Sequence, residues 1–174
     1  MHSRIFELKT NKEDDNELSE HDFEEGYLST KFDYVVELDK EGDYNDSMQW
    51  LQNSYGNSIK VDIAQKTIQF LDPSKLVSKS FEKFKEALDT LSCMDINDFI
   101  NVNHEPANID HDICYVMWQL KDAYSSDCEF FIYHDNELKS VNDFIRDYNR
   151  FLRDHHGDIT KRVFHFGTIL DYHI

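Results

Sequence analysis

The 174-residue sequence has few of the residues that build tight turns, linkers and phosphate-binding loops: five glycines and two prolines. No Gly-rich loop of the Walker or dinucleotide-binding type occurs, which excludes those nucleotide sites. No stretch rich in proline, glycine and serine marks a domain boundary. We therefore expect one domain over residues 1–174, and 40% hydrophobic residues provide enough apolar material for its core.

Cysteine is also scarce, because Cys93, Cys114 and Cys128 form no C-x-x-C pair and leave one thiol over. This pattern excludes a zinc knuckle and a disulfide scaffold. The sequence has no apolar run long enough to cross a membrane, and its N-terminus lacks the apolar core of a secretion signal. We expect a cytoplasmic protein that needs no cofactor and binds no membrane.

Basic residues are outnumbered, with 18 lysines and arginines against 35 acidic residues and a formal net charge of −17. A charge of this sign repels phosphate backbones, so direct binding of nucleic acid through a basic surface is not expected. Binding to a protein that itself binds nucleic acid stays open.

The hydrophobic patterning predicts an α+β domain with a mainly antiparallel sheet packed by amphipathic helices. Alternating residues predict strands over 4–9, 128–133 and 162–172, with a bulge at Gly167, and a central β-hairpin over 59–71. Helical spacing predicts helices over 45–55, 73–91, 95–101, 109–124 and 140–156. Residues 28–36 fit a helix or a strand, and we favour the helix. We expect the strand at 128–133 in the centre of the sheet, 134–137 as a turn, and the acidic region 10–46 to be partly loop.

One helix is expected to organise the core. Its apolar stripe consists of Val77, Phe81, Phe84, Leu88 and Leu91, which recur at steps of four and three residues. A hairpin cannot bury its apolar face alone, so we expect this stripe to pack on the hairpin at 59–71. Two further pairs, Ser19 with Asp22 and Ser140 with Asp143, have the spacing of helix N-terminal capping boxes.

Two clusters contain the residue types that ligate divalent metals. They comprise His104, Glu105, Asp110, His111 and Asp112, and then Asp154, His155, His156 and Asp158. Neither matches the helical H-E-x-x-H spacing, and acids at a helix start or histidines at a helix end also have a structural explanation in the helix dipole. No G-x-S-x-G or Gly-flanked cysteine occurs, so we assign no catalytic residue.

The negative charge is concentrated near the N-terminus. Residues 1–46 contain 15 acidic and 5 basic residues, a net charge of −10, while the remaining 128 residues contribute −7. Aromatic side chains among charges are typical of protein interfaces. The predicted partner-binding residues are Glu13, Asp14, Asp15, Glu17, Glu20, Asp22, Glu24, Glu25, Asp39, Glu41, Asp43, Tyr44 and Trp50.

These observations favour a small, non-enzymatic, acidic binding protein that covers the basic, nucleic-acid-binding surface of a partner protein, as inhibitors and immunity proteins do. One alternative is a metal-assisted hydrolase that uses His104, Glu105, His111 and either His155 or His156. Another is a domain whose charge serves only solubility. The sequence leaves the identity of the partner and the oligomeric state open.

Overall fold

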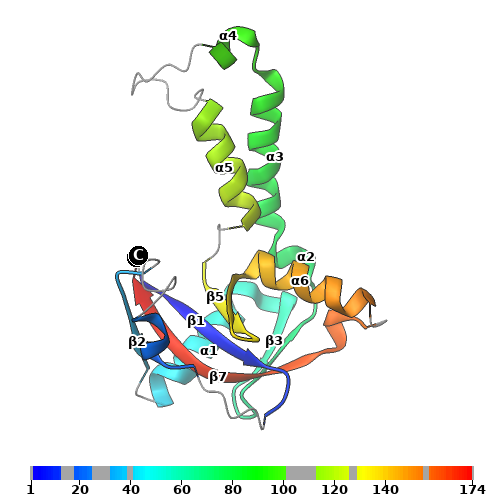
Figure 1. Ribbon diagram of the computed structural model, residues 1–174. Helices are drawn as coiled ribbons and strands as arrows, with labels where there is room; N and C mark the ends of the chain where they lie inside the picture. Colours follow the sequence, from blue (N-terminus) through cyan, green and yellow to red (C-terminus); the bar gives the residue numbers. More distant parts are fainter. Residues whose placement is uncertain are drawn as a thin grey trace.

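The computed structural model describes residues 2–12, 18–24, 32–38, 41–100, 113–125, 129–154 and 157–173 (Figure 1). These residues form six α-helices and one mixed seven-stranded sheet. The α+β class predicted from the sequence is thus confirmed.

The sheet is mostly antiparallel, and its one parallel pair in the described segments joins β1 to β5. Its strands are β1 (His2–Lys9), β2 (Tyr34–Glu37), β3 (Ile59–Asp62), β4 (Thr67–Phe70), β5 (Phe131–His134), β6 (Glu137–Ser140) and β7 (Val163–His173). The order is β3-β4-β7-β1-β5-β6, and β2 pairs with the C-terminal part of β7. The N-terminal strand, the hairpin and the C-terminal strand are present as predicted.

The helices differ in how closely they contact the sheet. They are α1 (Glu41–Tyr55), α2 (Pro73–Leu76), α3 (Ser78–Cys93), α4 (Ile96–Ile100), α5 (Ile113–Ser125) and α6 (Val141–Asp154), with short 3-10 turns η1 (Glu20–Phe23), η3 (Gly56–Ser58) and η5 (Ile159–Lys161). Figure 1 shows α1 and α6 beside the sheet, whereas α3 and α5 extend away from it. We refer to α3 and α5 together as the stalk, and to α4 as its tip.

The alternation of β1 and β7 divides the core into two parts. Phe6 and Leu8 point to the face covered by α1 and α6, where Phe6 lies edge-on to Phe130 with ring centroids 5.4 Å apart. Ile5 and Tyr172 point to the other face, which is covered by η1 and the residues around Phe32. The sheet is therefore buried on both sides over its central strands.

The expected packing of the helix at 73–91 on the hairpin is wrong. The chain breaks at Val77 into α2 and α3, and α3 pairs with α5 instead, leaving Phe81 59% and Leu88 49% exposed. The hairpin is covered by α6, where Phe144 contacts Phe70 with ring centroids 5.5 Å apart. Helical spacing identifies an apolar stripe but not the surface that the stripe meets, and here α6 and α1 cover the hairpin face.

Two smaller expectations also need correction, and one further strand was not predicted. The favoured helix at 28–36 is a strand, β2, in its described part, because the end of β7 provides an unpaired edge for it. The turn expected at 134–137 is present, with Asp135 and Asn136 at its centre at φ of 52° and 61°, values that Asp and Asn tolerate. It joins two strands rather than a strand and a helix, because β6, which was not predicted, begins at Glu137. The predicted strand at 128–133 appears as β5, which lies second from one edge of the sheet rather than at its centre.

The bulge predicted at Gly167 is confirmed by a register shift between Phe6 and Leu8 opposite β7. The extra space receives the Glu7 side chain, which is only 4% exposed. Its carboxylate accepts hydrogen bonds from the backbone N–H of Thr168 at 2.7 Å and of Leu18 at 3.2 Å. A Cβ at position 167 would overlap this carboxylate, so any other residue there would force the Glu7 side chain to move.

Candidate functional site

The described acidic residues of the N-terminal region gather at the end of the sheet where β1 starts and β7 finishes. In the strand register, Asp171 lies opposite Arg4 of β1 on one side and opposite Val36 of β2 on the other. The Glu20 carboxylate of η1 accepts a hydrogen bond from the backbone N–H of Glu37 at 3.2 Å, which attaches η1 to the outer edge of β2. These contacts bring η1, β2 and the start of α1 to one end of the molecule.

The 3-10 turn η1 presents its acids to solvent because its apolar residues are anchored. Leu18 and Phe23 are buried, and Phe23 packs on Phe32 with ring centroids 5.8 Å apart. The predicted pairing of Ser19 with Asp22 is confirmed, since the Ser19 backbone N–H donates to the Asp22 carboxylate at 2.8 Å. The turn is thereby fixed at both ends.

The first two turns of α1 contribute the second group of acids. Glu41, Asp43 and Asp46 are exposed, and negative charge at this position is favoured by the helix dipole. Met48 and Leu51 are almost completely buried and fix the opposite side of the helix on the sheet. The helix therefore holds three carboxylates outward on a rigid element.

A hollow of about 420 Å³ lies between α1 and the start of β1, lined by Ser3, Arg4, Asp43, Asp46, Ser47 and Trp50. Arg4 is held inside it: its guanidinium is paired with Asp171, and its Nε donates to the Ser47 hydroxyl at 3.1 Å. The one arginine in this hollow is thus already bound to a carboxylate.

We define the acidic end by its exposed or half-exposed carboxylates that have no lysine or arginine within ion-pair distance among the described residues. These are Glu20, Asp22, Glu24, Asp33, Glu37, Glu41, Asp43 and Asp46. Glu24 is paired only with His21, at 2.8 Å, and this pairing raises the pKa of His21. Residues of η1 cover one face of the sheet and those of α1 the other, so the negative charge wraps around the end.

The two aromatic residues predicted to anchor a partner differ in position. Tyr44 is half-buried; its hydroxyl donates to the Gly167 carbonyl and the Lys66 ammonium lies 4.8 Å from its ring centroid. Trp50 is 39% exposed at the rim of the hollow, with its other side stacked on Phe6. Trp50 is accordingly the aromatic residue that a partner could reach.

The other predicted residues lie outside the described segments. They are Glu13, Asp14, Asp15, Glu17, Glu25 and Asp39 of the acidic set, and His104, Glu105, His111, His155 and His156 of the metal set. Within the described segments, no three histidine, cysteine or acidic side chains are placed to hold a metal ion.

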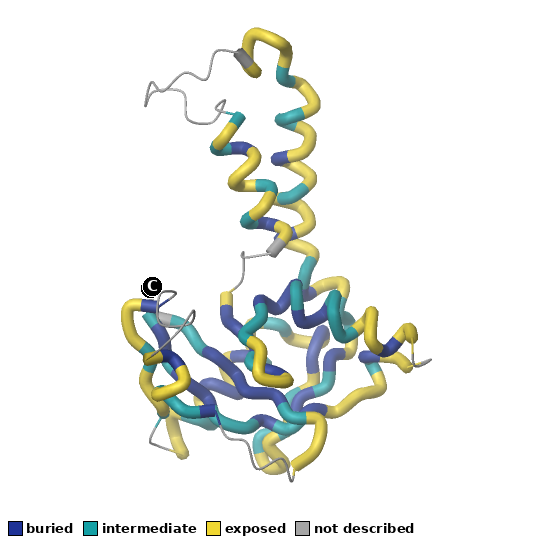
Figure 2. The backbone as a smooth tube through the Cα atoms, viewed as in Figure 1, coloured by how far each residue is buried: buried dark blue, intermediate teal, exposed yellow. Residues whose placement is uncertain are grey.

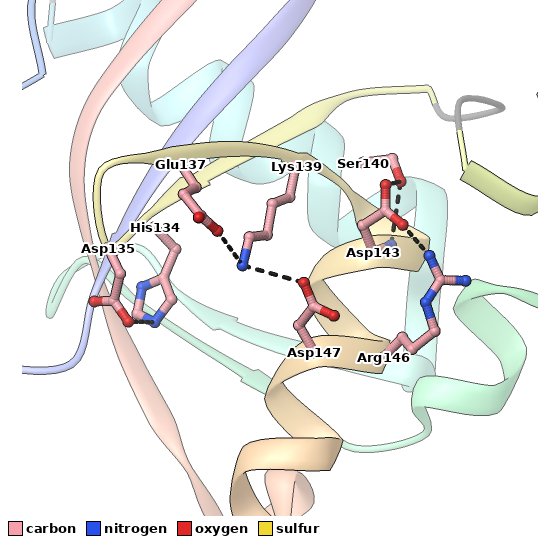
Figure 3. Close-up of polar contacts among 8 residues, drawn as sticks. All are labelled: His134, Asp135, Glu137, Lys139, Ser140, Asp143, Arg146 and Asp147. Atoms are coloured by element: carbon pink, nitrogen blue, oxygen red, sulfur yellow. Dashed lines mark hydrogen bonds and ion pairs between the residues drawn. The ribbon is translucent and has the colours of Figure 1, made fainter.

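A second polar cluster, at the β5–β6 hairpin and α6, was not predicted (Figure 3). His134 is 5% exposed and donates from Nδ1 to the Leu8 carbonyl at 2.7 Å. Its Nε2 atom is buried without a hydrogen bond to any described residue, and lies 3.4 Å from an Asp135 carboxylate oxygen in a geometry that is not a hydrogen bond. Phe130, Ile132 and His134 alternate along the chain, and this signal could have indicated that His134 faces the core.

Beside His134, one lysine joins the hairpin to α6. The Lys139 ammonium lies 2.7 Å from Glu137 and 3.2 Å from Asp147 (Figure 3). Burial lowers the pKa of Lys139, but the hydrogen bonds to the two carboxylates outweigh it, so that its pKa is raised. Burial also raises the pKa of Tyr148, which lines the adjoining hollow of about 250 Å³.

This second cluster has the character of a structural element. The Lys139 charge is compensated, and the His134 ring is enclosed by Phe144, Tyr148 and Phe164, with centroids 5.4 to 5.8 Å away. Ser140 and Asp143 form the predicted cap of α6, because the Asp143 backbone N–H donates to the Ser140 hydroxyl at 3.1 Å. The cluster thus fastens α6 to the sheet, and the acidic end is the candidate site.

Comparison with known proteins identifies no relative: the chain matches no protein family, no curated protein and no solved structure. None of the helices in the described segments has the length and apolar character that a membrane span requires.

Proposed function

We propose that the protein is a non-enzymatic binding protein whose acidic end docks on the basic surface of a partner protein, in the manner of an inhibitor or immunity protein. The observation that supports this proposal is the gathering of eight carboxylates, without a lysine or arginine partner among the described residues, at one end of the sheet. A charge distribution that served solubility alone would be spread over the surface.

Rigid display of the charge strengthens the proposal. Glu41, Asp43 and Asp46 are fixed by the burial of Met48 and Leu51 on the same helix. A partner therefore meets preformed negative charge, and little side-chain or backbone freedom is lost on docking. Such a surface accelerates association with basic proteins by electrostatic steering.

Trp50 gives the docking surface an apolar contact at its border. Its ring is 39% exposed beside the hollow that contains Arg4 and Asp46. Tryptophan is enriched among the residues that contribute most to protein–protein affinity. We expect carboxylates to govern the association rate and Trp50 to govern the dissociation rate.

The proposal is tested by charge reversal with a matched control. The test variant combines Glu24→Lys, Glu41→Lys and Asp46→Lys. The control combines Asp62→Lys, Glu86→Lys and Asp154→Lys, which changes the net charge equally at exposed positions outside the acidic end. Immobilised wild-type protein is incubated with cell extract at low ionic strength, bound proteins are identified by mass spectrometry, and the purified partner is then measured by surface plasmon resonance with all three proteins.

We expect a partner with a high isoelectric point whose association rate constant falls about 10-fold or more with the test variant, while the control retains most of the rate. Binding should weaken steeply as salt is raised, because exposed charges are screened. An equal decrease in the association rate constant for the test and control variants would show that only the net charge matters, and it would refute a docking role for the acidic end.

A further inference from the structure

The stalk has an unusual distribution of side-chain size. The fully buried residues where α3 and α5 meet are small or medium in size: Ser80, Ala87, Val116 and Ala123. Figure 2 shows the consequence, since most of the stalk is exposed and only short stretches are buried. The helices approach each other through small residues, with Phe84, Leu91 and Leu120 half-buried, and several of their other large apolar residues are exposed.

Seven of the thirteen exposed large hydrophobic residues in the described segments belong to the stalk or its tip. They are Phe81, Leu88, Ile96, Phe99, Met117, Trp118 and Tyr124, each between 49% and 67% exposed. Single exposed apolar residues are ordinary, but a concentration on one protruding element marks an interaction surface.

Helical geometry places four of these residues on one side of the stalk. A groove between the two helices is lined by Lys83, Thr90, Gln119 and Asp122 above Ala87 and Ala123, and it defines one side. Phe81 and Leu88 lie on the opposite flank of α3 from Lys83 and Thr90, and Met117 and Tyr124 lie correspondingly on α5. We call Phe81, Leu88, Met117 and Tyr124 the apolar face.

The charge of the stalk indicates what covers this face. Its helices contain four basic residues, Lys79, Lys83, Lys85 and Lys121, and four acidic residues, Glu82, Glu86, Asp89 and Asp122. The stalk is thus neutral, and the rest of the chain accounts for the whole net charge of −17. Two copies of so acidic a protein repel each other elsewhere but can meet at the stalk.

We propose that the apolar face and the tip bind a second copy of this chain, so that two stalks form an antiparallel four-helix arrangement. Half-exposed aromatic and long aliphatic side chains offer about 100 Å² each. The apolar face with Ile96 and Phe99 therefore supplies about 600 Å² per copy, which approaches the roughly 800 Å² per partner of a stable interface once the polar rim is included. A closed two-fold dimer is the commonest arrangement of soluble oligomers.

The antiparallel orientation follows from the charge outside the stalk. At 1.5 Å per residue, the 16 residues of α3 span about 24 Å. Antiparallel stalks hold the two acidic sheet domains at opposite ends, separated by more than the Debye length of about 8 Å at physiological salt. Parallel stalks would place both domains side by side. This proposal concerns the stalk only and does not depend on the function of the acidic end.

The test is sedimentation velocity of the full chain between 1 and about 100 µM, with purified protein alone. We expect the wild type to dimerise, and Leu88→Lys combined with Met117→Lys to weaken dimerisation at least about 100-fold. The control, Thr90→Lys combined with Gln119→Lys, adds the same charge on the groove side and should still dimerise. Circular dichroism should show native helix content for all three proteins, since the substituted residues are exposed or, for Thr90, half-exposed.

A cross-linking measurement tests the same proposal without disrupting the surface. Lys85 lies at the middle of α3 beside the apolar face, so Lys85→Cys should approach its own copy across the two-fold axis of an antiparallel dimer. In a background with Cys93, Cys114 and Cys128 replaced by serine, we expect oxidation to give a disulfide-linked dimer, and Glu86→Cys to give little. A monomeric wild type at 100 µM, a dimer that survives Leu88→Lys with Met117→Lys, or absence of the Lys85→Cys product would each overturn the proposal.

Discussion

The buried carboxylate of Glu7 should be among the most sensitive positions of the protein. The carboxylate accepts hydrogen bonds from the backbone N–H groups of Thr168 and Leu18, and it forms an ion pair with the Lys9 ammonium at 3.7 Å. The side chains of Lys9 and Glu7 are only 10% and 5% exposed. Glu7→Gln removes the charge and replaces one acceptor oxygen by a donor while keeping the shape.

The expected loss of stability follows from these contacts. One backbone N–H would face the new amide N–H₂ group, which costs about 1–3 kcal/mol for an unsatisfied buried donor. Breaking a buried ion pair from one side costs about 3–5 kcal/mol when the remaining charge has no partner, so the loss here lies at the lower end, because Lys9 has a further interaction besides its ion pair with Glu7. We expect a decrease of about 3 kcal/mol in the free energy of unfolding, a large part of the 5–15 kcal/mol typical of a domain.

Urea unfolding followed by circular dichroism provides the measurement. With a slope of about 2 kcal/mol per molar urea, the midpoint should fall by about 1.5 M. Glu129→Gln is the matched control, because its ion pair with Lys79 is exposed and should contribute less than about 1 kcal/mol. A Glu7→Gln midpoint within the error of the control would refute the view that this carboxylate stabilises the bulge.

Two further substitutions test neighbouring parts of the argument. Gly167→Ala places a methyl group where the Glu7 carboxylate lies, so it should lower the free energy of unfolding by about 1–3 kcal/mol, and an unchanged urea midpoint would show that the carboxylate can move aside without cost. Hydrogen bonds from the Thr160 hydroxyl and backbone N–H lower the pKa of Asp158 in the folded protein below its ordinary value of 3.8. The ionised carboxylate therefore stabilises the fold above pH 3.8, and this stabilisation is lost as the pH falls through the pKa of the folded protein. Asp158→Ala should accordingly destabilise the protein at pH 7, and its difference from the wild type should shrink as the pH is lowered below 3.8 in parallel urea titrations, whereas a difference that does not change with pH would argue against the charged hydrogen bond.

Local elements of the fold could be predicted because neighbouring residues decide them. Alternation alone identified β1, β3, β4 and β7, and the predicted caps at Ser19 and Ser140 form because both partners lie within four residues of each other. The bulge at Gly167 was predictable for the same reason, since a glycine within an apolar strand often marks a bulge. The buried acid that occupies the bulge lies 160 residues away and could not be found locally.

The arrangement of helices could not be predicted, because it depends on competition for surface. The apolar and polar sides of α6 are more sharply separated than those of α3, and Phe144 and Leu152 of α6 are buried at the sheet while Phe81 of α3 is exposed. The sequence of α3 did indicate its pairing with another helix. Ser80 and Ala87 are small residues seven positions apart, beside the apolar stripe, and small residues on one side of a helix allow a second helix to approach closely. The acidic end was predictable as a charge excess, whereas its position around the end of the sheet required the pairing of β2 with β7.

The two proposed surfaces differ in their physical origin, and ionic strength can therefore separate them. Docking through the carboxylates of η1 and α1 should weaken as salt is raised, because exposed charges are screened within about 10 Å at 0.1 M. Dimerisation through Phe81, Leu88 and Met117 buries apolar groups on a neutral element, and added salt should leave it unchanged or strengthen it by screening the repulsion between the acidic domains. At high salt, then, a dimer without bound partner should remain, and an antiparallel dimer would present its two acidic ends to separate partner molecules.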